Sequence, residues 1–442
     1  MLFIKITTSY KVKLKDQINL KTNKNMSLDK ASLDNTIKIY REALLFVIDA
    51  VNKEWDVIEP FGKMGRKVVV ERLIHSTKDR IAKYDFDSKF YKFPSYFRRS
   101  VISTAIGIVS AYKSSLENWE KAGKVTKEPQ LNLYHFEFPA FYKGNCFTKE
   151  TDTIVSLKVY KNNDWVWVSF TLKETDVKYI LRHCSSRNEL CPILCKIDKN
   201  YYLRFVFEEE VKLPRIDETD AKILAVDLGL NHDAVMCVMD SVGTVYARKF
   251  VKIAYEKDQL NHVLNQIKRD QKKYGYMNQR LWRKANNLND QIGEKTSLEI
   301  INFALLHQVD YIVFEHLDLK GKKHGKMKQK LSLWRAQQIQ AIVGLKAHQN
   351  RIRISRVCAY NASKLAYDGS GIVERDKKNY SLCTFTTKKK YNCDLNATYN
   401  IGARFFLRVY DKKAKEENKL KIKTSERTLQ TLKDYLNPVY NK

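Results

Sequence analysis

An acidic residue at the tip of a strongly apolar strand is the feature that most constrains this chain, and it occurs twice. Residues 223–226 are apolar and are followed at once by Asp227, with Gly229 two positions later. Residues 309–314 repeat the design and end in Glu315. Short apolar runs of this length are typical of buried strands. A carboxylate at the end of a buried strand is costly unless its charge is compensated, and a divalent metal ion is the usual compensation.

A third acid stands far along the chain. Asp394 opens the sequence DLNATYNI, where the pattern predicts the first turn of a helix. Taken singly, an Asp in such a place is more often a turn former or a helix N-cap than a metal ligand, and Glu315 by itself is equally consistent with a solvated carboxylate. The order strand-Asp-x-Gly, strand-Glu and Asp-x-Asn-Ala favours a cluster of three carboxylates, which suits hard cations such as Mg²⁺.

These three motifs resemble the three blocks of the split RuvC nuclease domain in the TnpB family. The matching stretches are VDLGLN around Asp227, VFEHLDL around Glu315 and DLNATYNIGAR from Asp394. TnpB proteins are transposon-encoded, RNA-guided DNA endonucleases, and the compact type V CRISPR effectors are similar to them. The resemblance covers about the C-terminal half of the chain, whereas the N-terminal half matches in layout more than in motif.

The resemblance implies an RNase H-like α/β domain in which Asp227, Glu315 and Asp394 are the catalytic and metal-binding residues. Phosphodiester hydrolysis needs an activated water and a stabilised leaving oxygen, which two Mg²⁺ ions about 3.5–4 Å apart supply. We expect Asp227 to bridge both ions and each of the other acids to complete one site. Asn396 and Asn400 are expected to cap and support the last helix.

The resemblance also implies the partners. A guide RNA, either transposon-derived or a CRISPR RNA, would select double-stranded target DNA by base pairing, while the protein reads a short flanking motif. Two alternatives remain open. An RNA-guided DNA-binding repressor would not cut, but such relatives lose acidic residues and all three stand here. An RNA-independent transposase or resolvase would share the three acids without needing the N-terminal architecture described below.

The charge of the chain is an independent sign of a polyanionic partner. Its 442 residues include 80 Lys and Arg against 50 Asp and Glu, a formal net charge of +30. Phosphate neutralisation with counterion release drives the binding of such chains to nucleic acids, although a ribosomal or membrane-surface protein would share this charge. With 44% apolar and 29% charged residues, the chain is globular and long enough for two or three domains.

The sequence predicts a cytoplasmic protein without a membrane partner. No stretch approaches the ~20 apolar residues of a spanning helix, and the opening MLFIKI is too short for the core of a signal peptide. A monomer is favoured, with the oligomeric state left open. The eight cysteines follow no regular framework, which is typical of a reducing compartment. Cys191 and Cys195 are expected to be buried thiols.

The cysteines also argue against a zinc site. TnpB relatives usually carry two CxxC pairs between the second and third acidic blocks, which form a zinc ribbon. This interval contains only Cys358, Cys383 and Cys393, without a CxxC pair, and a closed structural zinc site needs four ligands. We therefore predict that no zinc is bound and that packing holds the insert 359–393 together. The packing residues would be Leu365, Tyr367, Tyr380, Leu382 and Phe385.

The first half of the chain switches between strand and helix patterns. Residues 2–14 alternate as strands do, and helical periods begin at Ser27 and continue around residues 68–84 and 95–122. Residues 131–213 return to a strand period, with hairpins predicted at the turns 162–164 and 198–200. We therefore predict a multidomain α+β protein. Its domains would be a β-barrel wedge domain (1–26 and 127–215), a helical recognition domain inserted into it (27–126) and the RuvC nuclease domain (216–442).

Within the nuclease domain, strands and helices alternate, which favours an α/β architecture. The pattern predicts a three-stranded meander at 223–227, 234–239 and 244–250, then helices at 255–274 and 277–308. The later elements would be a strand at 311–314, a helix at 331–347, a strand at 351–357, a helix at 396–410 and a charged tail.

Two groups of basic residues are candidate nucleic-acid contacts. Tyr91, Arg98, Arg99 and Lys113 interleave aromatic and basic side chains on or near the long helix, a pattern that can track a phosphate backbone and stack on bases. The alternative is a solvated helix face with tyrosines at the edge of a core. A lysine-rich loop after Glu315 suits a lid over a nucleic-acid strand, or is simply a solvated loop. Its candidate residues are Lys320, Lys322, Lys323 and Lys326.

Overall fold

The computed structural model of the chain describes residues 2–131, 133, 138–275, 278–317, 333–376, 378–379, 381–414 and 420–437. The chain divides into two compact units. The N-terminal unit comprises residues 7–209, and the C-terminal unit comprises residues 1–6 and 210–442. The N-terminal unit contains the segment predicted as the helical recognition domain and most of the segments predicted as the wedge domain. The predicted start of the nuclease domain at residue 216 lies close to the division between the units.

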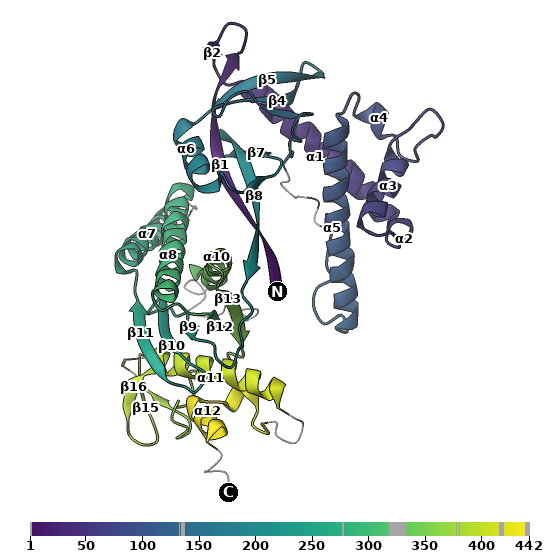
Figure 1. Cartoon of the computed structure of the whole chain (residues 1–442). Helices are drawn as coiled ribbons and strands as arrows, with labels where there is room; N and C mark the ends of the chain where they lie inside the picture. Colours follow the sequence, from purple (N-terminus) through teal and green to yellow (C-terminus); the bar gives the residue numbers. More distant parts are fainter. Residues whose placement is uncertain are drawn as a thin grey trace. The chain divides into compact units, whose positions relative to one another are not determined.

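The N-terminal unit is built on a sheet that curls into a half-barrel (Figure 1). Its strand order is β3-β4-β5-β1-β8-β6, with β2 paired to β1 and β7 paired to β8. The longest strands, β1 and β8, are neighbours in this order. The strands are β1 (Leu2–Asn19), β2 (Lys24–Met26), β3 (Phe147–Lys149), β4 (Ile154–Lys161), β5 (Asp164–Leu172), β6 (Asn188–Glu189), β7 (Ile193–Ile197) and β8 (Asn200–Leu213).

Both predicted hairpins of this sheet are confirmed. The β4–β5 turn places Asn162 and Asn163 at φ 51° and 59°, the left-handed conformation that a tight hairpin turn requires and that Asn tolerates. The β7–β8 turn places Asp198 at φ 54°. Residues 174–184 lie in the region of predicted strand period but form α6 (Glu174–Cys184) instead.

The helices of the unit are α1 (Lys30–Lys53), α2 (Trp55–Ile58), α3 (Lys63–Ile74), α4 (Phe86–Lys89) and α5 (Ser95–Lys121). The carboxylate of Asp29 caps α1 by accepting from the Ser32 N–H at 3.1 Å, so the helix begins at Lys30, just inside the helical period expected from Ser27. The helix expected around 68–84 ends at Ile74. At His75 the backbone becomes extended, and the imidazole contacts the Asp87 carboxylate at 2.9 Å.

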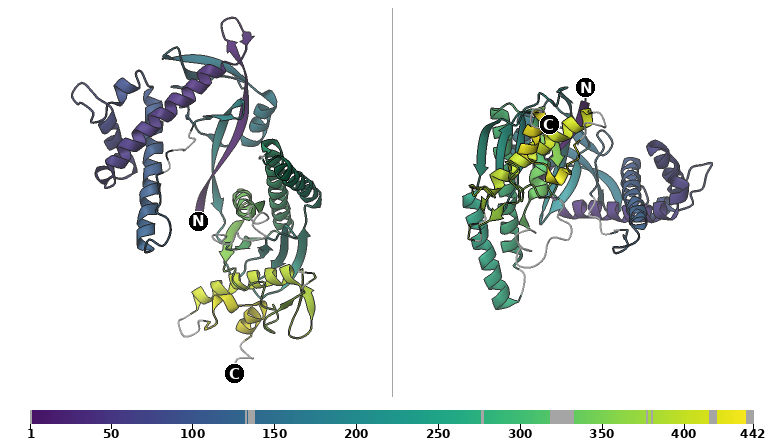
Figure 2. Two further views of the ribbon diagram at one scale, coloured as in Figure 1. Left: turned by 180° about the vertical axis from the view of Figure 1, so that it is seen from behind. Right: turned by 90° about the horizontal axis from the view of Figure 1, so that it is seen from below.

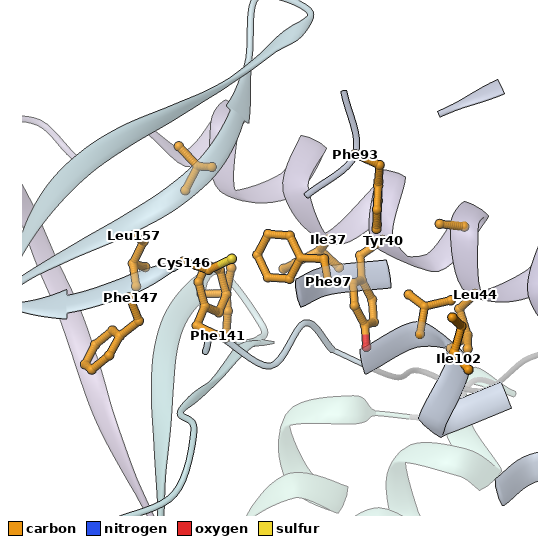
Figure 3. Close-up of a cluster of buried hydrophobic side chains, with 14 of the residues drawn as sticks. Ile37, Tyr40, Leu44, Phe93, Phe97, Ile102, Phe141, Cys146, Phe147 and Leu157 are labelled. Carbon is orange, nitrogen blue, oxygen red and sulfur yellow. The ribbon is translucent and has the colours of Figure 1, made fainter. Parts of the chain in front are cut away.

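Helices and sheet of this unit share one hydrophobic core, which is why they form a single compact body. Tyr40 of α1 and Phe97 of α5 pack edge to face with ring centroids 6.2 Å apart. Phe97 in turn contacts Phe141 at 5.1 Å, and the cluster continues to Phe147 and Leu157 of the sheet (Figure 3). Burying each such side chain fully contributes roughly 1.5–3 kcal/mol.

The C-terminal unit contains a five-stranded sheet in the order β11-β10-β9-β12-β13. The pairs β11/β10 and β10/β9 are antiparallel, and β9/β12 and β12/β13 are parallel. The predicted meander and the two later strands are confirmed. The strands are β9 (Ile223–Asp227), β10 (Ala234–Met239), β11 (Val245–Val251), β12 (Tyr311–Glu315) and β13 (Arg353–Val357).

Helices cover both faces of this sheet, as Figures 1 and 2 show. Because side chains alternate along a strand, Ala225 and Val235 belong to the core under α11, while Leu224 and Met236 belong to the core shared with α8 and α10. Helix α11 lies very close to the sheet: a Cβ added at Gly402 would stand 3.0 Å from the Sδ of Met239. The helices are α7 (Ala254–Tyr274), α8 (Gln279–Leu306), α10 (Ala336–Gln349), α11 (Cys393–Lys413) and α12 (Leu429–Leu436).

Two parts of the unit differ from expectation. The tail predicted only as charged contains a short 3₁₀ helix (Thr424–Glu426) and α12, whose Leu429 and Leu432 are buried in the core under α11. The insert folds into a small antiparallel sheet of β14 (Glu374–Arg375), β15 (Leu382–Thr384) and β16 (Lys390–Asn392). Among the helices that the structure describes, none is both long enough and apolar enough to cross a membrane.

Candidate active site

Asp227 and Glu315 project from the same face of the sheet at the same level. In the parallel pairing of β9 with β12, Val313 lies opposite Ala225, and both residues belong to the core under α11. Asp227 lies two positions after Ala225, and Glu315 lies two positions after Val313. Because side chains alternate along a strand, both carboxylates lie on the α11 side. Neighbouring strands are about 4.8 Å apart. The two strand-end acids found in the sequence are therefore adjacent in the fold.

Helix α11 brings the third acid to the same end of the sheet. Its N-cap is Asn392, whose side-chain oxygen accepts from the N–H groups of Asp394 and Leu395 at 3.0 and 2.9 Å. Asp394 therefore stands in the first turn, where the helix dipole favours a negative charge. Its carboxylate lies 3.4 Å from the Nδ1 of His232, a residue of the loop that follows Asp227.

The loop between β9 and β10 has to turn sharply to bring His232 there. A Cβ added at Gly229 would stand only 2.9 Å from the carbonyl oxygen of His232, closer than such atoms approach in folded proteins. The end of the loop is fixed by Asp233, whose buried carboxylate accepts from the Ile253 N–H and pairs with Lys257, both at 2.8 Å. The Asp-x-Gly pattern seen in the sequence thus has a steric reason.

The electrostatics of Asp227 are consistent with the three carboxylates lying close together. Burial raises the pKa of the Asp227 carboxyl well above its usual value, and the negative charges of Glu315 and Asp394 raise it further. Arg375 of the insert opposes this shift in the pKa. Like charges crowded in this way disfavour ionisation unless a cation is added. The site is therefore electrostatically prepared to bind positive charge.

The donor set fits Mg²⁺, because carboxylate oxygens are the ligands that this ion prefers. In the side-chain positions of the structure, no three His, Cys, Asp or Glu residues within the described ranges are close enough to hold one ion.

Two asparagines of α11 have a different role from the one expected. Asn396 and Asn400 do not cap the helix, because Asn392 does. Instead, they are fully buried and hold the insert against the helix. Asn396 accepts from the Tyr367 N–H and donates to the Leu365 carbonyl, both at 2.8 Å. Asn400 donates to the Leu365 carbonyl at 2.9 Å and accepts from the Leu429 N–H at 3.2 Å. Through these bonds the two asparagines fix the insert and the start of α12 to the helix that carries Asp394.

Arg404, one turn further along α11, is fully buried, and its hydrogen bonds to the described part of the chain go to backbone carbonyls. Its guanidinium donates to four backbone carbonyls, those of Cys358, Tyr360, Ser425 and Arg427, at 2.7–3.1 Å. Burial lowers the pKa of this guanidinium. Arg404 thus ties the chain beyond β13 and the chain before α12 to the helix that carries Asp394.

The insert is held by a small core that only partly matches the prediction. Phe385 is buried and Tyr367 packs against it, as expected, whereas Leu382 is 37% exposed. Tyr380 lies outside the described residues. Cys383 and Cys393 belong to this small core instead of Leu382. Their thiols are buried in contact with each other, and burial raises the pKa of both. Of the other cysteines singled out, Cys195 is buried and Cys191 half-buried.

The predicted nucleic-acid contacts of the N-terminal unit separate into two kinds. Arg98 is buried and lies 3.5 Å from carboxylate oxygens of both Glu71 and Asp87, so it is a structural ion-pair residue and not an available phosphate contact. The other three candidates are accessible. Tyr91 is 71% exposed, Arg99 is exposed over the Tyr96 ring, and Lys113 lies over the Tyr112 ring. The loop candidates Lys320, Lys322, Lys323 and Lys326 lie outside the described residues.

Four residues near the acids were not found from the sequence. They are His232 of the loop between β9 and β10, Arg248 and Phe250 of β11, and Arg375 of the insert, so no local spacing joins all four. Phe250 and Arg248 carried one available signal: they alternate on the outer strand of a meander whose first strand ends in Asp227.

The chain is similar to known proteins in sequence. Residues 15–161 match the Aq_aa04 family. The TnpB-like protein aq_aa05 of Aquifex aeolicus (strain VF5) is 27% identical over 236 residues, which cover 47% of this chain and 74% of the relative.

Two solved structures have a similar fold. A Cas12f1–sgRNA–target DNA complex matches with a TM-score of 0.53 at 13% identity, covering 90% of this chain and 98% of the other. The mini-RNA-guided endonuclease CRISPR-Cas_phi3 matches with a TM-score of 0.53 at 10% identity, covering 90% and 92%. The resemblance predicted from the three acidic motifs is confirmed: the chain is a relative of the TnpB-like proteins and shares its fold with the compact type V CRISPR effectors.

Proposed function

We propose that this chain is an RNA-guided DNA endonuclease with a single metal-dependent RuvC-type active site formed by Asp227, Glu315 and Asp394. The observation that carries the proposal is that three acids lie together at one end of one sheet. The first and the last of them, Asp227 and Asp394, are more than 160 positions apart in the sequence. A basic protein that merely coats a polyanion has no need to crowd negative charges at one point. Crowding of this kind is typical of a catalytic metal site.

The arrangement of the C-terminal unit supports an RNase H-like fold. Its sheet joins an antiparallel meander to two parallel strands, and helices cover both faces. Both strand-end acids lie at the carboxyl ends of parallel strands, where α/β sheets carry their ligands. The third comes from the helix packed on that face.

Each residue of the site has a task that its contacts suggest. Asp227 would bridge two ions, Glu315 and Asp394 would each complete one site, and the bound Mg²⁺ pair would supply an activated water and a stabilised leaving oxygen. His232 orients the Asp394 carboxylate from 3.4 Å. Arg375 is within electrostatic reach of Asp227 and is placed to offset charge on the phosphate. The main chain of Glu315 is held by Gln340, which donates to its carbonyl at 3.1 Å.

The guide RNA and double-stranded DNA partners are supported by charge and by fold. The formal charge of +30 suits long polyanions, and the Cas12f1 structure of the same fold is described as a complex with sgRNA and target DNA. Exposed cation–aromatic pairs in the N-terminal unit, such as Arg99 with Tyr96, suit a nucleic-acid surface.

The decisive experiment has two readouts. Purifying the full chain from cells and sequencing the RNA that co-purifies tests the guide, and incubating the complex with matching double-stranded DNA and Mg²⁺ tests cleavage. We expect both a defined RNA species and cutting of the DNA. Asp227→Asn should abolish the cutting, whereas Asp217→Asn, an exposed control between β8 and β9, should leave it intact. Defined RNA without cutting by the unaltered protein would favour the repressor. Cutting without RNA would favour the transposase or resolvase.

A further inference from the structure

Strand β11 carries two side chains on the same face as the acids, and nothing in the function proposed above has used them. Phe250 pairs with Val235, and Val235 pairs with Asp227 on its other side. Phe250, Val235 and Asp227 therefore form one row across three strands, two inter-strand spacings or about 10 Å from end to end. Arg248 lies two positions before Phe250 and projects from the same face.

Both side chains are accessible although they lie beside packed elements. Phe250 is 43% exposed, and its ring lies against His232 with centroids 5.2 Å apart. Arg248 is exposed and its guanidinium lies 5.6 Å from the ring centroid of Tyr399 in α11. A single exposed Phe on a protein surface needs no explanation. This one differs because His232 contacts it on one side and the Asp394 carboxylate on the other.

The chemistry of the pair selects one kind of occupant. An aromatic face can stack on a base, and a neighbouring Arg can bind the adjoining phosphate, the combination by which proteins hold single strands without reading their sequence. A duplex keeps its bases stacked inside, so it offers no free base face to Phe250. Charge complementarity favours the same occupant, because Arg248 projects from the same face of the sheet as the acids and would hold a phosphate that the acids alone repel.

We infer that Phe250 and Arg248 form a platform for the single strand about to be cut, with Phe250 stacking on the base next to the scissile phosphate and Arg248 binding a phosphate beside it. This rests on the proposed endonuclease function and names the form of its substrate at the site. Both are positioning residues: they hold the strand in line with the acids and take no part in bond cleavage.

The test uses the full-length protein with its co-purified RNA, in the Asp227→Asn background, so that binding is measured without cleavage. The probe is a short single-stranded DNA that contains a fluorescent adenine analogue whose emission falls on stacking. We expect Phe250→Leu, which keeps apolar bulk but removes the aromatic face, to weaken binding about 5- to 150-fold. Phe250→Trp should preserve both the affinity and the quenching. Tyr255→Ala removes another exposed aromatic, 72% accessible on α7, and should change neither.

A strand with one abasic position provides the sharpest comparison. If Phe250 stacks on a base, the abasic strand loses the same affinity, and Phe250→Leu weakens it no further. Arg248→Gln should lower the salt dependence of binding by about 0.7 in the slope of log K against log salt, the value for one phosphate contact on a single strand. Equal weakening of intact and abasic strands by Phe250→Leu, or affinity and quenching equal to those of the Tyr255→Ala control, overturns the inference.

The same variants separate this inference from the proposed function. In the cleavage-competent protein, Phe250→Leu should raise KM or slow single-turnover cutting while retaining the Mg²⁺ dependence. If the unaltered protein does not cut, the endonuclease proposal fails but the stacking measurements still decide what the platform binds. If it cuts and Phe250→Leu cuts with the same KM and rate, only the platform is refuted.

Discussion

The charges at the edge of the N-terminal core and the buried carboxylate of Asp227 in the C-terminal unit have opposite kinds of surroundings. In the N-terminal unit, charges at the edge of the core are matched: Arg98 lies between Glu71 and Asp87, and Asp29 pairs with Lys161 at 2.8 Å. In the C-terminal unit, Asp227 is placed against two further carboxylates, and its pKa is raised by burial and by their charges. Matched charges stabilise a fold, whereas crowded like charges cost stability. The contrast separates charges that stabilise the fold from a carboxylate whose crowding costs stability.

The largest expected effect is on DNA cleavage, at the site where Asp227 is crowded by two further carboxylates. Asp227→Asn removes the carboxylate that we expect to bridge two ions, so cleavage of target DNA should fall by roughly 10³-fold or more. Single-turnover cutting assays on purified complex measure this, with affinity for RNA and DNA expected to stay nearly unchanged. A cleavage rate within tenfold of that of the unaltered protein would show that Asp227 is not a catalytic residue. The contrast drawn above would then have no functional meaning.

Arg404 sharpens the comparison, because it is a buried charge in the C-terminal unit that is matched. Replacing it by Met removes hydrogen bonds to four backbone carbonyls and leaves those acceptors unpaired. We expect a loss of about 3–5 kcal/mol in the free energy of unfolding, measured by denaturant titration. Arg408→Met, one turn along the same helix with a more accessible side chain, is the matched control. A loss no greater than that of the control would mean that these carbonyls find other partners.

The same substitution, Asp to Asn, should have opposite consequences for stability in the two units. Hydrogen bonds from Lys161 and Ser32 lower the pKa of the Asp29 carboxyl, although burial alone would raise it. Asp29→Asn keeps a good helix cap but loses the ion pair, so we expect a loss of about 1 kcal/mol at neutral pH. Asp227→Asn relieves like-charge crowding and should not lower the melting temperature of the metal-free protein.

The effect at Asp29 has a defined pH dependence. Because the pKa of Asp29 is lower in the folded than in the unfolded chain, its contribution is complete above the unfolded value near pH 4 and is lost as the pH falls through the folded value. Melting curves of the two proteins should therefore converge toward acid pH. A difference in melting temperature that persists at low pH would show that Asp29 acts through packing instead.

The smallest expected effect concerns the insert. Since we predict that packing and not zinc holds it, a zinc chelator should leave the melting temperature unchanged, and elemental analysis should find no stoichiometric zinc. Chelation of Mg²⁺ with EDTA should stop cleavage in the same preparation. A clear fall in melting temperature with the zinc chelator would show that Cys383 and Cys393 bind a metal after all.

Much of this architecture follows from local sequence pattern. The strands that end in Asp227 and Glu315, the long helix α5 and both hairpins of the N-terminal sheet can be predicted because hydrophobic period and turn chemistry are local. Helix α6 was missed inside a region of strand period, although its buried residues Val177 and Cys184 lie two helical turns apart.

Other features depend on contacts between distant residues. Arg98 looks like a basic surface residue in the sequence, and only the approach of Glu71 and Asp87 buries it in ion pairs. The contact between His232 and Asp394 joins residues 162 positions apart. The row from Phe250 to Asp227 depends on sheet register, which pattern alone does not specify.

The close approach of α11 to the sheet at Gly402 has a consequence for how this site tolerates change. The helix that presents Asp394 packs at Gly402 directly against Met239 and Ala225. The absence of a side chain at this position therefore sets the distance between the helix and the strands. Even one methyl group at position 402 would require the Met239 side chain or the helix to shift by a few tenths of an ångström. Gly402, more than two helical turns after Asp394, thus helps to keep the Asp394 carboxylate close to those of Asp227 and Glu315.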